Sequence, residues 1–230
     1  MIFYFTGTGN SRYIAKKISE ITGDTLVSMN DKIKQDNTHP ICVENGLVFV
    51  VPTYGWRIPR VVEQWIRSTQ FIGAGQAWFV MDCGSEIGNA AKYIRQLCEE
   101  KGFAYMGTTQ VIMPENYIAM FNVPEETEAE QIIKNAAPVI NSVAHKIANG
   151  EAFPAPRNNL SDRFMSSAVN PIFYRLFVKA DALQRLTKGN MINNNKMDCQ
   201  PYRKRRPAVK RAAFLCDRER RKTYEETGPK

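Results

Sequence analysis

The sequence predicts an α/β protein built on a doubly wound, five-stranded parallel sheet with helices on both of its faces. First, short β-prone runs alternate with amphipathic helical patterns from residue 1 to residue 150. Second, these runs are continuously apolar rather than alternating, as expected of strands buried on both faces. Third, the strands end in loops rich in glycine, proline and small polar residues, which mark strand-to-helix turns.

The first elements follow from apolar spacing and from breaker residues. Residues 1–5 form the first predicted strand, and residues 12–21 form a helix whose isoleucines recur on one face. Gly23 ends that helix, residues 24–28 are a short second strand, and residues 29–45 are polar and expected to be loop. The remaining elements continue the alternation, with strands over 46–52, 76–81 and 103–113 and helices over 60–68, 89–101 and 125–147.

The positive charge of the chain is confined to its C-terminal part. The whole chain carries a net charge of +8, but residues 182–230 hold 14 basic and 5 acidic side chains, a net of +9. The first 181 residues therefore hold 17 basic and 18 acidic side chains, a net of −1. We expect three parts: a globular domain over 1–150, a linker and connector helix over 151–181, and a basic, poorly structured tail over 182–230.

The cysteines and the hydropathy pattern exclude several classes of protein. Cys42, Cys83, Cys98, Cys199 and Cys216 form no C-x-x-C pair, which argues against a zinc site or a redox dithiol. The apolar run at the start is too short for a signal peptide, and no run approaches the roughly 20 apolar residues that span a bilayer. We expect a cytoplasmic protein with reduced thiols, no membrane span and no metal site.

Three loops follow the carboxyl ends of predicted strands, where open α/β sheets bind ligands. Residues 6–11 are rich in glycine and hydroxyls and lead into a helix, which is a phosphate-binding arrangement. Residues 53–59 carry two large aromatic side chains, and residues 82–88 are small, polar and rich in glycine. A flat aromatic ligand bearing a phosphate would use all three loops, with its ring against the second and third. Flavin mononucleotide (FMN) has that shape.

The first loop resembles that of the flavodoxin family, which reads roughly Thr/Ser-x-Thr-Gly-Asn-Thr/Ser. This chain has Thr6, Thr8, Gly9, Asn10 and Ser11 at the matching positions. The resemblance extends over residues 1 to 150 and implies a flavodoxin-like fold with FMN in the three loops. The residues expected to bind FMN are Thr6, Gly7, Thr8, Gly9, Asn10, Ser11, Thr53, Tyr54, Gly55, Trp56, Asp82, Cys83, Gly84 and Gly88.

In the flavodoxin family an aromatic side chain of the second loop stacks on the isoalloxazine ring. The resemblance implies that role for Trp56, with Tyr54 as the other candidate. No catalytic side chain is expected, because in such proteins the cofactor carries the chemistry. Cys83 is expected to pack rather than react, since nothing basic lies beside it in the sequence.

A closer resemblance, to the flavodoxin half of bacterial flavodoxin–ferredoxin fusion proteins, is carried by residues 52–59, 113–117 and 170–174. The fusion proteins continue into a segment with two 4Fe-4S clusters, which need a C-x2-C-x2-C pattern and a further cysteine before proline. The tail here offers only Cys199 and Cys216, so it does not support clusters. Our interpretation is that the tail is read out of frame, which translation of the other two frames would test.

The expected function is that of an FMN-binding electron-transfer protein acting on redox partner proteins. One alternative is an NAD(P)H-dependent flavin or quinone reductase. A nicotinamide dinucleotide as the ligand of the first loop is disfavoured, because Arg12 stands where a third glycine is expected. The other alternative is a non-redox protein whose basic run at 203–206 binds a partner or nucleic acid. Nucleic acid is disfavoured, since charge runs are more often solvated tails.

Overall fold

A computed structural model describes residues 1–44, 46–115 and 123–154 of the chain. Five strands form its main sheet: Ile2–Tyr4 (β1), Leu26–Ser28 (β2), Leu47–Pro52 (β4), Gln76–Cys83 (β6) and Ala104–Ile112 (β7). They lie in the spatial order β2-β1-β4-β6-β7, and every neighbouring pair is parallel. Numbered within this sheet alone, the order is 2-1-3-4-5, which is the flavodoxin-like doubly wound arrangement. The predicted fold class is confirmed.

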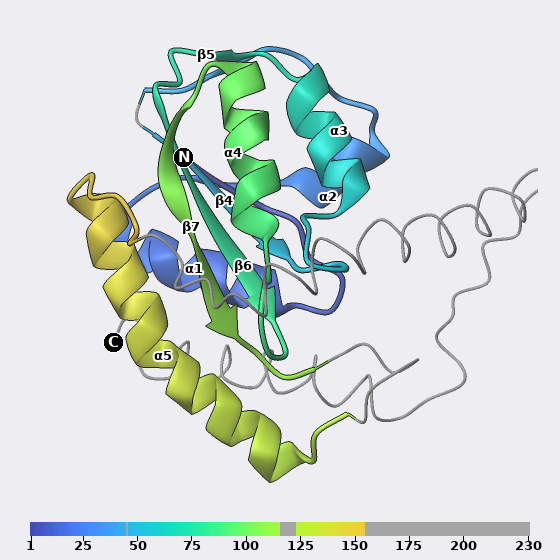
Figure 1. Ribbon diagram of the computed structural model, residues 1–230, viewed down its shortest axis with the longest axis vertical. Coiled ribbons are helices and arrows are strands. Elements are labelled where there is room, and N and C mark those ends of the chain that lie inside the picture. The colour runs from blue at the N-terminus through green and yellow to red at the C-terminus, as the bar shows by residue number, and fades with distance from the viewer. Residues whose placement is uncertain (45, 116–122, 155–230) are drawn as a thin grey trace, which may run out of the picture.

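Helices cover both faces of the sheet (Figure 1). The helices Asn10–Thr22 (α1) and Glu126–Ala148 (α5) pack on one face. Arg60–Ser68 (α3) and Ala90–Lys101 (α4) pack on the other, near the short helix Met29–Lys34 (α2). Two further strands, Ile41–Cys42 (β3) and Phe71–Ile72 (β5), pair with each other outside the main sheet.

The core divides into two layers because successive side chains of a strand point to opposite faces. On β4, which is buried at every position, Phe49 joins the layer under α3 and α4, whereas Val48 joins the layer under α1 and α5. Phe49 also stacks between Phe3 and Phe79, with ring centroids 5.6 Å and 4.9 Å away. Burial of each such side chain contributes roughly 1.5–3 kcal/mol, and together these rings join the three central strands.

The strand order puts the topological switch point, where doubly wound sheets form a crevice, between β1 and β4. From the carboxyl end of β1 the chain turns into α1 on one face, and from the carboxyl end of β4 it turns into α3 on the other. Because the two loops leave in opposite directions, they diverge and open the ligand-binding point of a doubly wound sheet. The topology therefore places the first two predicted loops on either side of this crevice.

The prediction of a loop over residues 29–45 is wrong, since α2 and β3 lie within it. The helix begins because the hydroxyl of Ser28 accepts a hydrogen bond from the backbone N–H of Asp31 at 3.3 Å. Met29 anchors the helix, as its side chain is fully buried in the core. A single buried residue in a polar stretch gives no helical period, so the pattern could not reveal this turn.

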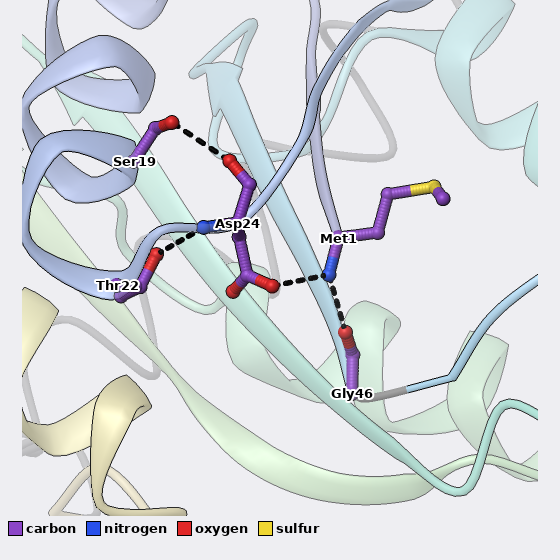
Figure 2. Close-up of polar contacts among 5 residues, drawn as sticks. All are labelled: Met1, Ser19, Thr22, Asp24 and Gly46. Carbon is purple, nitrogen blue, oxygen red and sulfur yellow. Dashed lines mark hydrogen bonds and ion pairs between the residues drawn. The ribbon is translucent and has the colours of Figure 1, made fainter.

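The α-amino group of Met1 joins three segments at the amino-terminal edge of the sheet (Figure 2). It donates to a carboxylate oxygen of Asp24 at 3.1 Å and to the carbonyl of Gly46 at 3.0 Å. The backbone of Asp24 is held in turn by the hydroxyls of Ser19, at 2.7 Å, and Thr22, at 3.2 Å. This network fixes the start of β1 against the turn before β2 and the start of β4.

The segment after α5 returns to the sheet. The indole N–H of Trp78 donates to the carbonyl of Glu151 at 2.8 Å. The backbone N–H of Phe153 donates to the carbonyl of Met106 at 2.7 Å. The rest of the expected linker and connector, and the whole basic tail, lie outside the described residues. The domain boundaries at 150 and 181 therefore stay predictions. Within the described ranges, no helix combines the length and hydropathy that crossing a membrane requires.

Candidate functional site

The structure brings the three predicted loops together at the carboxyl edge of the sheet. The first loop leaves β1 and the second leaves β4, whereas Asp82 and Cys83, expected in the third loop, form the last residues of β6. Both other loops contact Asp82: Ser11 of the first loop donates to its side chain, and the backbone N–H of Thr53 of the second donates to its carbonyl at 2.9 Å. The side chain of Asn10 also donates to the carbonyl of Pro114, after β7, at 3.1 Å. The sequence-predicted residues thus belong to one continuous region.

The first loop turns tightly around Thr6. Its hydroxyl accepts a hydrogen bond from the backbone N–H of Gly9 at 2.9 Å, and Gly9 has a φ of 121°, which favours glycine. The helix α1 begins at the next residue, Asn10, and Gly9 provides no side-chain cap. Backbone N–H groups in the first turn of a helix have no intrahelical partner, so this end of α1 can donate to an anion.

Asn30, a residue that the sequence analysis did not single out, holds the first loop in place. Its side-chain oxygen accepts from the backbone N–H of Thr6 at 2.9 Å, and its side-chain nitrogen donates to the carbonyl of Thr6 at 3.0 Å. Asn30 lies in α2, within the stretch expected to be loop. An asparagine in a polar stretch carries no distinguishing signal, so only the fold could reveal this role.

The second loop is a tight turn with two residues at positive φ. Tyr54 and Arg57 exchange backbone hydrogen bonds of 2.9 Å and 3.3 Å, while Gly55 and Trp56 have φ values of 57° and 58°. Positive φ at both central positions is typical of a type I′ turn. For Trp56 this conformation costs roughly 1–2 kcal/mol, and such strain persists only where surrounding contacts enforce it.

The two aromatic side chains of the second loop reach toward different neighbours. The indole N–H of Trp56 donates to Glu86 at 3.3 Å, and its ring lies so close to Gly88 that an added Cβ there would be 2.9 Å from Cγ. Tyr54 is 50% exposed, and a Cβ added at Gly7 would lie 3.3 Å from its hydroxyl oxygen. Trp56 therefore closes the gap to the third loop, and Tyr54 leans toward the first.

The third loop is held from β7 by a side chain that the sequence analysis also missed. The side-chain oxygen of Gln110 accepts from the backbone N–H of Ile87 at 3.3 Å. Gly88 follows with a φ of 50°. At Gly84 an added Cβ would be 3.1 Å from the carboxyl carbon of Glu115, so that side chain crosses the loop. Glycine is thus needed at Gly88, where the φ is positive and the ring of Trp56 is close.

Cys83 is unsuited to nucleophilic chemistry. Burial, with the negative charge of Asp82 as the next cause, raises the pKa of its thiol to about 12. The thiol stays protonated at neutral pH, and a protonated thiol is a poor nucleophile. This agrees with the expectation that Cys83 packs rather than reacts.

Asp82 is a buried carboxyl group next to the N-terminal end of α1. Its side chain accepts a hydrogen bond from the hydroxyl of Ser11, and the two residues are only 5% and 1% exposed. Burial raises the pKa of Asp82 from 3.8 to about 6, and the hydrogen bond from Ser11 opposes part of that shift. Asp82 therefore changes its charge near neutral pH.

Thr53 carries a second unusual polar atom at this edge. Its buried hydroxyl has no hydrogen-bond partner among the described residues, although it lies where β4 ends beside the crevice. Buried hydroxyls are normally bonded, so an unpaired one calls for an explanation such as a ligand.

The positive side chain of the second loop is engaged by neighbouring residues. The only cationic side chain of the second loop in the described chain is Arg57, whose guanidinium stacks 3.9 Å above the ring of Tyr93 and lies 3.9 Å from Glu63. Within the same described ranges, no group of three or more His, Cys, Asp or Glu side chains could hold a metal ion. Backbone N–H groups and hydroxyls of the first loop are the donors available to an anion here, and Arg12 is an exposed cationic side chain in the first turn of α1.

No protein-family model and no curated protein matches this chain. Several solved structures are similar to it. The FMN-dependent NADH-azoreductase of Bacillus anthracis, in complex with FMN, is 9% identical over 64% of this chain and 99% of its own, with a TM-score of 0.39. The flavodoxin, WrbA-like protein of Agrobacterium tumefaciens is 15% identical over 64% and 96%, with a TM-score of 0.34. A flavodoxin from the domain Archaea is 13% identical over 63% and 97%, with a TM-score of 0.33. These scores are low, so the fold assignment depends on the strand order.

Proposed function

We propose that this protein binds FMN at the crevice between β1 and β4 and transfers electrons to partner proteins in the cytoplasm. The observation that carries the proposal is the convergence of three loops with different chemistry at one sheet edge. The first loop offers backbone donors at a helix N-terminus, the second offers aromatic rings, and the third offers small residues. A phosphate joined to a flat ring system matches this combination.

The first loop fits a phosphate group. Gly7 has no side chain, which leaves space between the first loop and Tyr54. A Cβ added there would already press on the hydroxyl of Tyr54. The first turn of α1 directs N–H groups and the positive end of the helix dipole toward this space. The unpaired hydroxyl of Thr53 is a further donor at the same edge. These residues can hold a phosphate without a basic side chain.

The second and third loops fit an aromatic ring. Tyr54 is the half-exposed aromatic side chain beside the phosphate loop, so its ring is available for stacking. Trp56, the residue favoured by the family resemblance, already has contacts to Glu86 and Gly88. We therefore assign stacking to Tyr54, with Trp56 setting the distance between the second and third loops.

Bound FMN would supply the redox chemistry, accepting and donating one or two electrons. The chain positions it through the residues above and adds electrostatics. Glu86 and Glu115 place carboxyl groups along this edge, and their charges act on Cys83. Negative side chains near the ring oppose the addition of further negative charge to it. The protein should therefore hold its flavin at a lower potential than free FMN has in water.

The proposal is tested by flavin binding to the purified chain. The protein should be yellow, or should take up FMN with quenching of flavin fluorescence. Gly7→Val should weaken this uptake because the side chain would crowd the hydroxyl of Tyr54 beside the first loop. Gly75→Ala is the matched control, since an added Cβ there meets nothing within 4 Å. A well-folded wild-type protein that neither carries nor binds FMN would refute the proposal.

A steady-state assay separates the electron carrier from the NAD(P)H-dependent flavin or quinone reductase. Oxidation of NADPH by the FMN-loaded protein, with a quinone as acceptor, would favour the reductase. Binding through the basic tail and the frame interpretation concern residues outside the described ranges. The resemblance to ferredoxin fusions, which includes residues 52–59 inside those ranges, also stays a prediction. We propose that the tail holds no 4Fe-4S cluster, because its two cysteines cannot supply the ligands.

A further inference from the structure

We propose that Asp82 is a positioning residue for the bound phosphate, because its protonation state decides whether the hydroxyl hydrogen of Ser11 points to Asp82 or to the ligand. This inference rests on the proposed function and concerns the regulation of the same site. It predicts that proton uptake by the protein accompanies the binding of FMN.

The geometry brings a buried carboxyl group and a buried hydroxyl together under the phosphate loop. Ser11 lies in the first turn of α1, one residue after Asn10, and donates its hydroxyl hydrogen to Asp82. Asp82 stands at the carboxyl end of β6 and is 5% exposed. Solvent therefore has little access to the pair, and a change in one partner must be compensated by the other.

The two protonation states differ in how the hydrogens are used. An ionised carboxylate can only accept, so the single hydrogen of Ser11 is committed to Asp82. A protonated Asp82 carries its own hydrogen and can donate it to the oxygen of Ser11. The hydroxyl hydrogen of Ser11 is then free to rotate toward a phosphate oxygen. The proton comes from solvent, and no bond other than the O–H bond changes.

The surroundings favour proton uptake. Burial raises the pKa of Asp82 to about 6, and no cationic side chain of the described chain is among the causes of its shift. The other titratable groups at this edge are Tyr54 from the second loop, Cys83 from β6, Glu86 from the third loop and Glu115 after β7. Burial, with the charge of Asp82 as the next cause, raises the pKa values of Tyr54 and Cys83, so both remain neutral.

A bound phosphate adds a like charge and raises the pKa of Asp82 further. Between its pKa in the free protein, about 6, and its higher value in the complex, binding takes up one proton. Affinity then falls as pH rises through this window, by up to about tenfold per pH unit. The second ionisation of the phosphate itself, with a pKa of about 6, favours binding at higher pH. The two effects must be separated by a variant.

Asp82→Asn provides that separation, because its side-chain NH₂ donates to Ser11 at every pH and imitates the protonated acid. Dissociation constants for FMN are measured from pH 5 to pH 9 by fluorescence quenching for the wild type and this variant. The dissociation constant of the wild type is then divided by that of the variant. The ionisation of the phosphate affects both constants equally, so it does not change this ratio. We expect a ratio near one at pH 5 that rises about tenfold or more by pH 8.

Further measurements distinguish positioning from a merely structural role. Riboflavin, which lacks the phosphate, should give a ratio that does not change with pH. Ser11→Ala should weaken FMN binding. The constant of Ser11→Ala divided by that of the Ser11→Ala, Asp82→Asn double variant should rise less with pH than the first ratio, because only the like-charge effect remains. Asp36→Asn, an exposed Asp-to-Asn change, should behave like the wild type. Thermal melts confirm that each variant folds.

Two results would overturn the inference. A ratio for FMN that stays constant with pH, or one that rises equally for riboflavin, would show that Asp82 acts only on the fold while the proposed function stands. Failure of every folded variant to bind either flavin at any pH would refute the proposed function, and this inference with it.

Discussion

Replacement of Asp82 by asparagine should change how the stability of the ligand-free protein depends on pH. The pKa of Asp82 is raised from 3.8 to about 6 by burial. The folded protein therefore binds this proton more tightly than the unfolded chain does. The contribution of protonated Asp82 to the free energy of unfolding is fully present below pH 4. It is lost as the pH rises through about 6. Above that pH the fold contains a buried negative charge.

The magnitude follows from the shift. A difference of about two pKa units, at 1.36 kcal/mol per unit, corresponds to about 3 kcal/mol of unfolding free energy. Asp82→Asn keeps a hydrogen bond to Ser11 and never ionises. The free energy of unfolding of the variant, minus that of the wild type, should therefore increase by about 2–3 kcal/mol between pH 4 and pH 8.

Urea unfolding monitored by tryptophan fluorescence at pH 4, 6 and 8 measures this difference. Other titrating groups are common to both proteins and cancel in the comparison. Asp36→Asn, which removes a charge from an exposed position, controls for the change in net charge. A difference that is the same at pH 4 and pH 8, or a variant that loses stability as pH rises relative to the wild type, would refute the reasoning.

Three further substitutions test the contacts that shape the site and the sheet. Asn30→Ala removes both hydrogen bonds to the backbone of Thr6, so urea unfolding should show a loss of about 2 kcal/mol, and FMN binding should weaken more than riboflavin binding. Gly88→Val places a branched side chain at a φ of 50° against the ring of Trp56, so stability should fall by about 2 kcal/mol or more, with a shift in tryptophan fluorescence. Asp24→Asn weakens the partly exposed ion pair with the α-amino group, and thermal unfolding should report a loss of at most about 1 kcal/mol.

The fold could be predicted because its main signals are local. The apolar run of β4 and the helix α3 were placed within one residue of their observed bounds, since buried parallel strands and amphipathic helices leave strong patterns. The pairing of β3 with β5 was missed, because each strand has only two residues and depends on a partner far along the chain. A pattern of that length has no period to detect.

The candidate site could be predicted in its motifs but not in its supports. Glycine and hydroxyl residues between a strand and a helix favour an anion loop, so Thr6 and Gly9 could be predicted from sequence as part of the candidate site. Asn30 and Gln110 could not, because their roles arise only when α2 and β7 are folded beside the loops. The raised pKa of Asp82 was equally inaccessible, since it results from burial in the tertiary structure.

These supports explain how loops with few internal bonds can hold a ligand-binding shape. Asn30 fixes the first loop from α2, the carbonyl of Pro114 fixes Asn10, and Gln110 fixes the third loop from β7. Each support satisfies a polar group of a loop from outside it, which leaves the remaining backbone donors of the loop for a ligand. A preorganised site loses less conformational entropy on binding than a mobile one. The affinity for the proposed flavin should therefore depend on side chains outside the recognisable motif as well as on the motif itself.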